Sequence, residues 1–136
     1  VKNGALSVNN STYTKVTGWT EEWDSHSAFA SDAFTVPANC GGRYLFQFQV
    51  VTASAMDDQE LLLAKLYKGA SEILYTVNYQ YISDSSDDRG GGLGGTAILD
   101  LAAADVISFY IFHNEGAAVD MLDGGCYFSG FRVTGV

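Results

Sequence analysis

Two strand motifs lie near opposite ends of this sequence, about ninety residues apart. Phe34-Thr35-Val36-Pro37 precedes Gly42-Arg43-Tyr44-Leu45-Phe46, and Phe128-Ser129-Gly130-Phe131 stands close to the C-terminus. Short runs of β-branched and aromatic residues lie between them, and Pro37 is the only proline. Because these runs have strand character and are separated by turn residues, the sequence predicts one β-sandwich that is closed by its last strand.

Length and composition limit the kind of chain this is. At 136 residues it is long enough to bury a full core, so we expect one domain that spans residues 1–136. Hydrophobic residues make up 47% of the chain, which indicates a globular protein rather than a disordered one. No apolar run approaches the roughly 20 residues that span a bilayer, so we expect no membrane partner.

The chain is acidic, with 16 Asp and Glu residues against 7 Lys and Arg residues and a net charge of −9. Such a charge repels polyanions, so we expect no binding to nucleic acid or to an anionic membrane surface. The simplest interpretation of the charge is solubility.

The clearest predicted strand is Arg43 to Ala53, where Tyr44, Phe46, Phe48 and Val50 alternate onto one face. Two long segments, Gly18 to Ser31 and Asp84 to Gly95, are predicted to be loops. The other strands expected from the pattern are Ala5–Val8, Tyr13–Val16, Ala33–Val36, Thr96–Leu101, Val106–His113 and Cys126–Thr134.

The segment from Ser54 to Gly69 fits two structures. Acidic residues near its start and lysines near its end would suit a helix, whereas Leu61-Leu62-Leu63 with Leu66 and Tyr67 would suit a buried strand. We expect the strand, paired as a hairpin with Glu72 to Tyr81, because a lone helix is less consistent with an all-β chain.

The run Val106 to His113 is apolar on both of its faces. A two-sheet sandwich buries one face of each strand, so a second apolar face requires either a very central strand or a contact between subunits. This pattern favours an oligomer.

The tract Gly90-Gly91-Gly92-Leu93-Gly94-Gly95 formally satisfies the dinucleotide-binding pattern G-x-G-x-x-G. It follows a Ser/Asp segment and leads into a strand, whereas that pattern requires a strand before it and a helix after it. We therefore expect a surface loop here and no nucleotide.

Two acidic clusters carry oxygen ligands of the kind that calcium prefers. One comprises Asp84, Asp87 and Asp88, and the other comprises Asp57, Asp58 and Glu60. Neither has the spacing of an EF-hand, so solvated acidic loops are the simpler interpretation. Calcium bound by Asp84, Asp87 and Asp88 is kept as the alternative, and no other cofactor is expected.

The sequence contains two histidines, His26 and His113, and no nucleophile-elbow motif accompanies either. No paired carboxylates stand out for sugar hydrolysis, so we expect a protein that is not an enzyme. Aromatic residues crowd the early segment, among them Trp19 and Trp23. They either cover the open end of the sandwich or anchor a sugar or a protein partner.

Three stretches together resemble the jelly-roll domain of the tumour necrosis factor (TNF) and complement C1q family. They are Ala33–Pro37 with Gly42, Tyr44 and Phe46; the turn Leu101–Val106; and Phe128–Phe131. Ala33 and Ala104 stand where the family usually has glycine. The resemblance implies an all-β, two-sheet antiparallel jelly-roll sandwich of about ten strands. In that fold Cys40 and Cys126 would lie at opposite ends of neighbouring strands, so two free thiols are expected.

Members of this family are usually trimers that pack through one sheet. The resemblance therefore implies a homotrimer whose contact face contains residues from the two motif strands. The interface residues it implies are Leu45, Gln47, Gln49, Val51, Tyr127, Ser129 and Phe131.

The stretch Asn10 to Val16, with the loop that follows and the Pro37 motif, is similar to small jelly-roll domains of bacteriophage virions. The first functional hypothesis is therefore a trimeric structural or host-binding head of a virus particle, with a host-surface protein or glycan as its partner. The alternative is a secreted complement-like or cytokine-like domain that binds a receptor or glycan. The expected location is the virion or the extracellular space.

Overall fold

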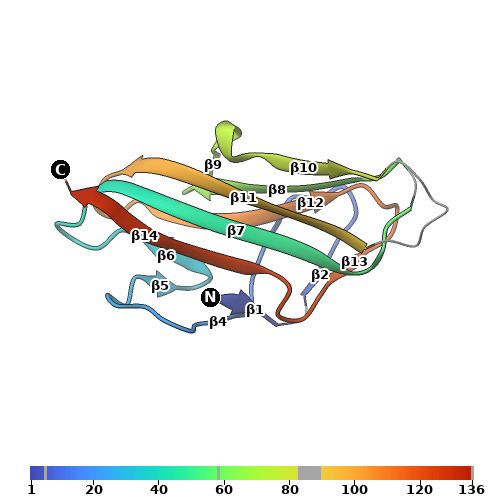
Figure 1. The fold of residues 1–136 in the computed structure, drawn as a ribbon, viewed down its shortest axis with the longest axis horizontal. Coiled ribbons are helices and arrows are strands. Elements are labelled where there is room, and N and C mark those ends of the chain that lie inside the picture. Colours follow the sequence, from blue (N-terminus) through green and yellow to red (C-terminus); the bar gives the residue numbers. More distant parts are fainter. Residues whose placement is uncertain (5, 58, 83–89, 136) are drawn as a thin grey trace.

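The computed structural model describes residues 1–4, 6–57, 59–82 and 90–135, and these are almost entirely β-structure (Figure 1). Within these ranges there is no helix long and apolar enough to cross a membrane. The elements are β1 (Lys2–Asn3), β2 (Leu6–Val8), β3 (Thr14–Lys15), β4 (Trp19–Thr20), β5 (Phe29–Ala30), β6 (Ala33–Thr35), β7 (Gly42–Ala55), β8 (Leu61–Lys68), β9 (Ser71–Glu72), the 3-10 turn η1 (Leu74–Thr76), β10 (Asn78–Tyr81), β11 (Gly90–Leu101), β12 (Val106–His113), β13 (Val119–Met121) and β14 (Tyr127–Gly135).

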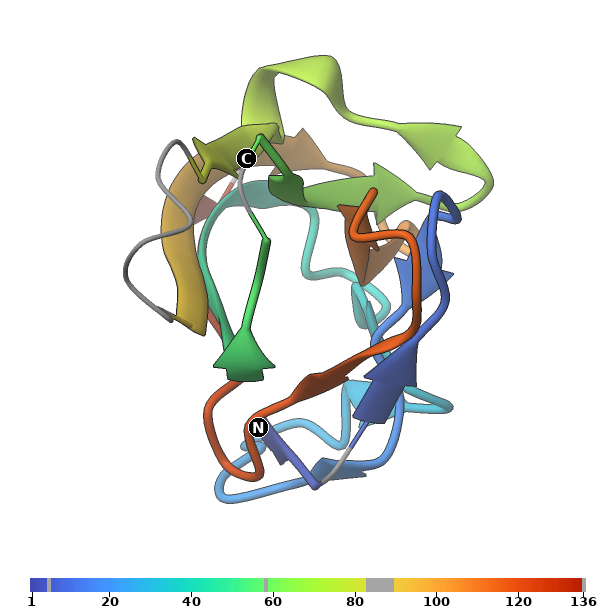
Figure 2. The ribbon, with the colours of Figure 1, turned by 90° about the vertical axis from the view of Figure 1, so that its right-hand side faces the viewer.

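These strands form two antiparallel sheets that pack face to face, as the end view shows (Figure 2). One sheet has the order β2-β13-β7-β14-β1-β4. In it β13 and β14 pair with successive parts of β7, and β11 pairs with the opposite edge of β7. The second has the order β10-β8-β12-β6-β5, with β3 beside β12 and β9 beside β8. This arrangement is the jelly-roll sandwich that the sequence predicts.

The core lies where β7 faces the second sheet. Tyr44, Phe46, Phe48 and Val50 are all buried, as their alternation predicts. The ring of Phe48 lies 5.1 Å from that of Phe109 on β12, and Phe46 stacks on Phe128 of β14 at 5.5 Å. The Phe48 ring therefore joins the two sheets, as does the Phe128 ring, which lies 6.4 Å from that of Phe109, whereas the contact of Phe46 with Phe128 links two strands of one sheet.

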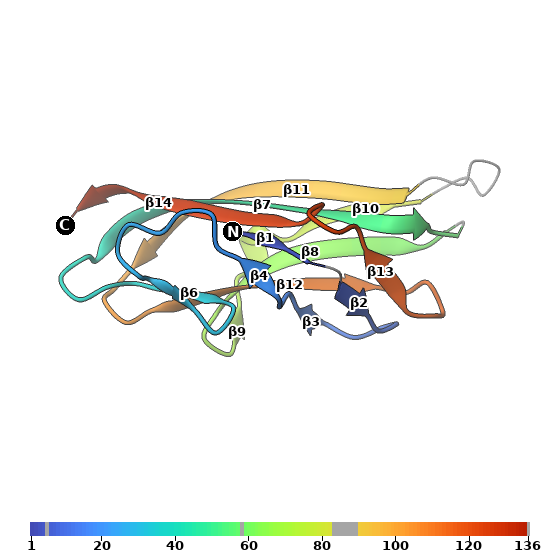
Figure 3. The ribbon, with the colours of Figure 1, turned by 90° about the horizontal axis from the view of Figure 1, so that it is seen from below.

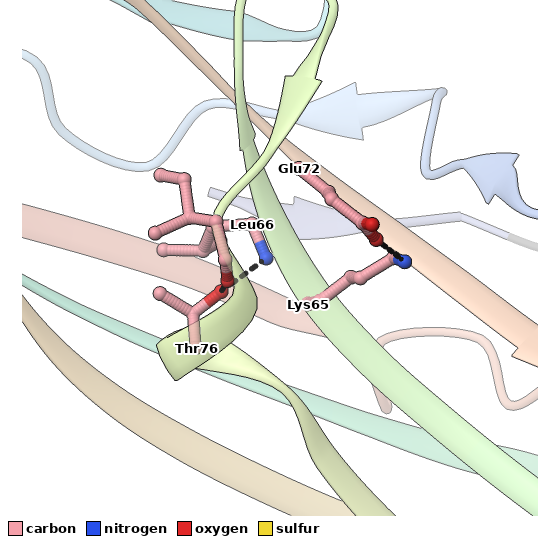
Figure 4. Close-up of polar contacts among 5 residues, drawn as sticks. Lys65, Leu66, Glu72 and Thr76 are labelled. Atoms are coloured by element: carbon pink, nitrogen blue, oxygen red, sulfur yellow. Dashed lines mark hydrogen bonds and ion pairs between the residues drawn. The ribbon is translucent and has the colours of Figure 1, made fainter.

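The expected hairpin is confirmed, since β8 pairs with both β9 and β10 and no helix forms between residues 59 and 69. The second arm is not the continuous strand that was predicted, because η1 interrupts it. The turn is held by Thr76, whose hydroxyl accepts the Leu66 N–H at 2.9 Å and donates to the Ile73 carbonyl at 2.8 Å (Figure 4). Beyond it, Tyr79 and Tyr81 face solvent.

The glycine tract is a strand, so the prediction of a loop from Asp84 to Gly95 is wrong from Gly90 onward. β11 begins at Gly90 and pairs with β7 as far as Leu101, with an irregularity between Gly90 and Gly92 and with Gly95 opposite Phe48. A β-carbon at Gly95 would lie 2.4 Å from the Phe48 ring and 2.3 Å from Asn78 Nδ2. The absence of a side chain lets this strand lie against a large aromatic ring.

Several short strands were not predicted. β13 pairs with β2 and continues the sheet past the end of β14, and the predicted loop from Gly18 to Ser31 contains β4 and β5. These strands are two or three residues long, which is too short to show an alternating pattern.

The second apolar face of β12 is covered by the chain itself. Tyr110 packs on Tyr67 with ring centroids 4.2 Å apart, and Phe112 packs on Tyr13 at 4.8 Å. Lys65 is buried here, its ammonium 3.5 Å from the Tyr13 ring centroid and bonded to the Glu72 carboxylate (Figure 4). Burial acts to lower the pKa of Lys65, but its hydrogen bonds to Glu72 and Tyr13 outweigh this and raise the pKa.

Candidate functional site

The structure places all seven predicted interface residues on one surface of two paired strands. Tyr127, Ser129 and Phe131 of β14 lie directly opposite Gln49, Gln47 and Leu45 of β7. Their neighbours Phe46, Phe48 and Phe128 are buried, so the alternation of a strand turns the seven outward. Whether a second copy covers this surface stays a prediction. We call the surface the sheet face: Leu45, Gln47, Gln49, Val51, Tyr127, Ser129 and Phe131, with Thr96 and Ile98 of β11.

The sheet face exposes large apolar groups among uncharged polar ones. Phe131 and Ile98 are each 58% exposed, and Tyr127 is 38% exposed. Among the described side chains of β7, β11 and β14 on this face, the charged pair is Arg43 and Asp100 at one end, whose Nε and Oδ1 are 3.1 Å apart. Sequence reasoning missed Thr96 and Ile98 because their place depends on the register of β11 against β7, which pairs them with Gln47 and Leu45.

A pocket of about 490 Å³ opens beside this face, between β14 and the segments around β5 and β6. Its walls include Phe29, Phe34, Tyr44, Phe46 and Phe128, and its rim carries Glu22, Trp23 and Arg132. The rings of Phe34 and Phe46 are 5.5 Å apart, and those of Phe29 and Phe128 are 6.2 Å apart. The pocket therefore has an aromatic interior and a charged rim, which suits an apolar side chain or small apolar ligand.

The early aromatic residues Trp19 and Trp23 differ in their surroundings. Trp19 packs between Phe29, Phe109 and Phe128, and its Nε1 donates to the Val16 carbonyl at 3.0 Å. It covers the open end of the sandwich. Trp23, in contrast, is 78% exposed at the rim of the pocket, where it is free to contact a partner.

Neither histidine is set up for nucleophilic catalysis. Ser25 Oγ lies 2.8 Å from His26 Nδ1, but the Asp24 carboxylate accepts the backbone N–H groups of His26 and Phe29 instead of orienting the ring. Burial acts to raise the pKa of Asp24, and these amide hydrogen bonds outweigh it, so the pKa lies below its ordinary value. His113 is fully buried and its two ring nitrogens contact the Val8 carbonyl and the Glu115 N–H.

The candidate calcium ligands Asp84, Asp87 and Asp88 lie outside the described residues. Within the described part of the chain, no group of three or more His, Cys, Asp and Glu side chains could hold a metal ion. In the second acidic cluster, the Asp57 N–H donates to both carboxylate oxygens of Glu115 at 3.0 Å. That contact fixes a loop.

Neither cysteine forms a disulfide, as predicted. Cys126 is fully buried at the start of β14, and burial raises the pKa of its thiol. Cys40 is partly exposed and lines the pocket.

The fold is the jelly roll of the TNF and C1q type. No protein-family model matches the chain, and no curated protein matches it in sequence. The globular domain of zebrafish complement 1qA protein is similar in structure, with a TM-score of 0.56 and 17% identity over 98% of this chain and 100% of that one. Eiger TNF from S. frugiperda has a TM-score of 0.65 and 14% identity over 98% of this chain and 87% of that one.

Proposed function

We propose that this protein is a homotrimeric, non-enzymatic recognition module whose subunits meet through the sheet face. The observation that carries the proposal is the continuous outer surface of β14, β7 and β11, where Phe131 and Ile98 are each 58% exposed and the central positions bear no charge. Single exposed apolar residues are ordinary, but several on adjacent strands form a patch that marks an association site.

Burial of this patch would supply the energy for assembly. Fully burying one exposed large apolar side chain contributes about 1.5–3 kcal/mol, and covering the part of Phe131, Ile98 and Tyr127 that is still exposed contributes a fraction of that for each. Gln47, Gln49 and Ser129 can form hydrogen bonds across the contact, so the interface need not bury a charge. The names of the two similar structures, a complement domain and a TNF, also support an oligomeric recognition module.

For the biological setting, the virion head that binds a host-surface protein or glycan is our first hypothesis, and it rests on the sequence similarity around residues 10–16. The secreted complement-like or cytokine-like domain is the alternative, and the names of the similar structures favour it. The genes beside the reading frame distinguish the two: virion genes support the first, and an encoded signal peptide or collagen repeat supports the second.

The assembly is tested by light scattering on the parent protein and on Phe131→Glu and Val51→Asp. We expect a parent mass near three times 14.6 kDa, and monomers for both variants, because an unpaired charge in an apolar interface costs several kcal/mol. Tyr79→Glu is the matched control, since Tyr79 is 71% exposed but lies on β10 of the other sheet.

A monomeric parent, or a Phe131→Glu variant that stays trimeric, would show that the sheet face is not the contact. Repeating the measurement with a calcium chelator tests the acidic residues Asp84, Asp87 and Asp88 at the same time. We expect no change, and a loss of the trimer on chelation would assign a bound ion to the assembly.

A further inference from the structure

The turn η1 holds two large apolar residues in solvent. Leu74 is 70% exposed and Tyr75 is 75% exposed, and Figure 1 shows the turn projecting from the sandwich beside β9. The next residue, Thr76, is buried, and its hydroxyl fixes the turn through its bonds to Leu66 and Ile73 (Figure 4). A turn that is fixed in this way does not have to be ordered when a ligand binds, so its exposed side chains are suited to recognition.

Leu74 and Tyr75 line a hollow near one end of the sandwich. The hollow has a volume of about 410 Å³ and lies between the segment from Ser71 to Tyr75 and the last residues of β11. Leu99 and Leu101 line it from β11, and both are buried. Sites for small molecules usually have volumes of about 300–1,000 Å³, so the hollow has the size of a small-ligand site.

The charges in the lining of the hollow are balanced. The three charged lining residues each belong to an ion pair: Lys68 with Asp105, Asp100 with Arg43, and Glu72 with Lys65. Because each pair sums to zero, the site has no excess charge with which to attract a cationic or an anionic ligand. The net charge of −9 on the whole chain also disfavours an anion. A neutral ligand therefore suits the hollow best.

The paired groups keep part of their hydrogen-bonding capacity. An ammonium has three donors and a carboxylate has about four lone-pair sites, so one ion pair uses only part of either group. Glu72 and Asp100 can therefore accept further hydrogen bonds, and the Ser71 hydroxyl both donates and accepts. The ring of Tyr75 adds an apolar face beside these polar groups. A pyranose sugar has the matching chemistry, because its hydroxyl groups lie around the edge of the ring and its C–H groups form apolar faces.

We propose that this hollow binds one neutral pyranose residue of a glycan. The sugar lies with a C–H face on the Tyr75 ring and directs hydroxyl groups to Ser71, Glu72 and Asp100. The proposal rests on the recognition role proposed above, for which it names a ligand and a site. None of the residues that define the sheet face lines the hollow, and β9 stands apart from β7, β11 and β14 (Figure 3), so the sugar site and the proposed trimer contact are separate.

The probes are the methyl glycosides of glucose, galactose, mannose and N-acetylglucosamine. Each is titrated into the nitrogen-15-labelled 136-residue chain while amide NMR spectra are recorded. We expect at least one sugar to bind saturably with a Kd of about 1 mM, and to shift the amide signals of Ser71 and Tyr75. The signal of Trp23 should stay in place, because Trp23 lines the other pocket.

Two tyrosine variants form a matched pair. Tyr75→Ala removes the ring that lines the hollow, whereas Tyr79→Ala removes a ring that is 71% exposed and does not line it. We expect Tyr75→Ala to weaken binding about tenfold or more and Tyr79→Ala to leave the Kd unchanged. Both side chains are exposed, so the amide spectra of the variants should show the parent fold.

The charge of the ligand is tested with the uronic acid that corresponds to the sugar that binds. We expect it to bind about fivefold more weakly, because its carboxylate meets a site without excess positive charge on an acidic protein. Tighter binding of the acid would contradict the assignment of a neutral ligand.

Absence of shifts with all of the sugars at about 50 mM would overturn the proposal and would leave a protein segment as the occupant of the hollow. Shifts at Trp23 in place of Ser71 and Tyr75, or equal losses of affinity in Tyr75→Ala and Tyr79→Ala, would also overturn it. Light scattering on the same samples separates this result from the assembly. A trimer that binds no sugar refutes only the sugar site, and a monomer that binds sugar refutes only the sheet-face contact.

Discussion

Two glycines of β11 should respond in opposite ways to the same substitution. Gly95 turns toward the core, where an added β-carbon would lie 2.4 Å from Cζ of Phe48 and 2.3 Å from Nδ2 of Asn78. Gly92 turns outward, and an added β-carbon there meets nothing closer than 3.8 Å. We therefore predict that Gly95→Ala destabilises the protein and that Gly92→Ala does not.

The magnitude follows from these contacts. Carbon atoms in van der Waals contact are about 3.5–4.0 Å apart, so the fully buried Phe48 ring would have to move by more than about 1 Å. Overpacking a core costs about 1–3 kcal/mol, and removing the chain entropy of a strand glycine returns about 0.5–1 kcal/mol. We expect Gly95→Ala to lower the free energy of unfolding by about 1 kcal/mol, and Gly92→Ala to raise it by about 0.5 kcal/mol.

Urea unfolding of the two variants and the parent measures these differences, with the transition followed by circular dichroism at matched concentration. Light scattering on each sample ensures that the compared species have the same oligomeric state, because Gly92 borders the sheet face. A Gly95→Ala variant that is as stable as Gly92→Ala would refute the packing described for β11. The glycine tract would then be a strand for reasons other than its contact with Phe48.

Two further predictions concern titratable groups. The Lys68 ammonium, 2.6 Å from Asp105, lowers the pKa of that carboxyl, as does the Ala102 amide; burial acts in the opposite sense. This stabilisation is present above the ordinary aspartate pKa of 3.8 and is lost as the pH falls through the lower folded-state pKa. Thermal unfolding of Asp105→Asn should therefore depend less on pH between about 5 and 2 than that of the parent. Equal pH profiles would contradict this. A maleimide at pH 8 should label Cys40 at once and Cys126 only in urea, because Cys126 is fully buried and burial raises its thiol pKa; mass spectrometry that finds both labelled in the native protein would count against this burial.

The sequence predicted those parts of the fold in which side chains report the backbone geometry. Tyr44, Phe46, Phe48 and Val50 alternate because β7 has one face on the core, and that period also placed Leu45 and Gln47 on the outer face. The hairpin was predicted because a lone helix is less consistent with an all-β chain, and in the structure Gly69 forms its turn with a φ of 58°.

The glycine tract escaped prediction because glycines carry no side chains to alternate. What makes Gly90 to Gly95 a strand is the neighbouring β7, which supplies the hydrogen bonds, and the Phe48 ring, which occupies the space of the missing side chain. Both causes come from tertiary structure, which overrides the local preference of glycine for turns.

The candidate sites were predictable to different degrees. The sheet face follows from alternation within β7 and β14 once the two strands are paired. The pocket depends on how closely the segment around Trp23 approaches Arg132, residues more than a hundred positions apart in the chain.

The pairing of β7 with β14 has a consequence for synthesis. Phe128, which lies opposite Phe48, is synthesised 80 positions later. Until then the edge of β7 that pairs with β14 has no partner strand. Because a ribosome adds about 5–20 residues per second, this edge of β7 stays unpaired for several seconds. During that interval the nascent chain has an exposed β edge and an open aromatic core, which are the features that chaperones bind and that drive aggregation. The sandwich therefore becomes resistant to misassembly only after its C-terminal strand has emerged.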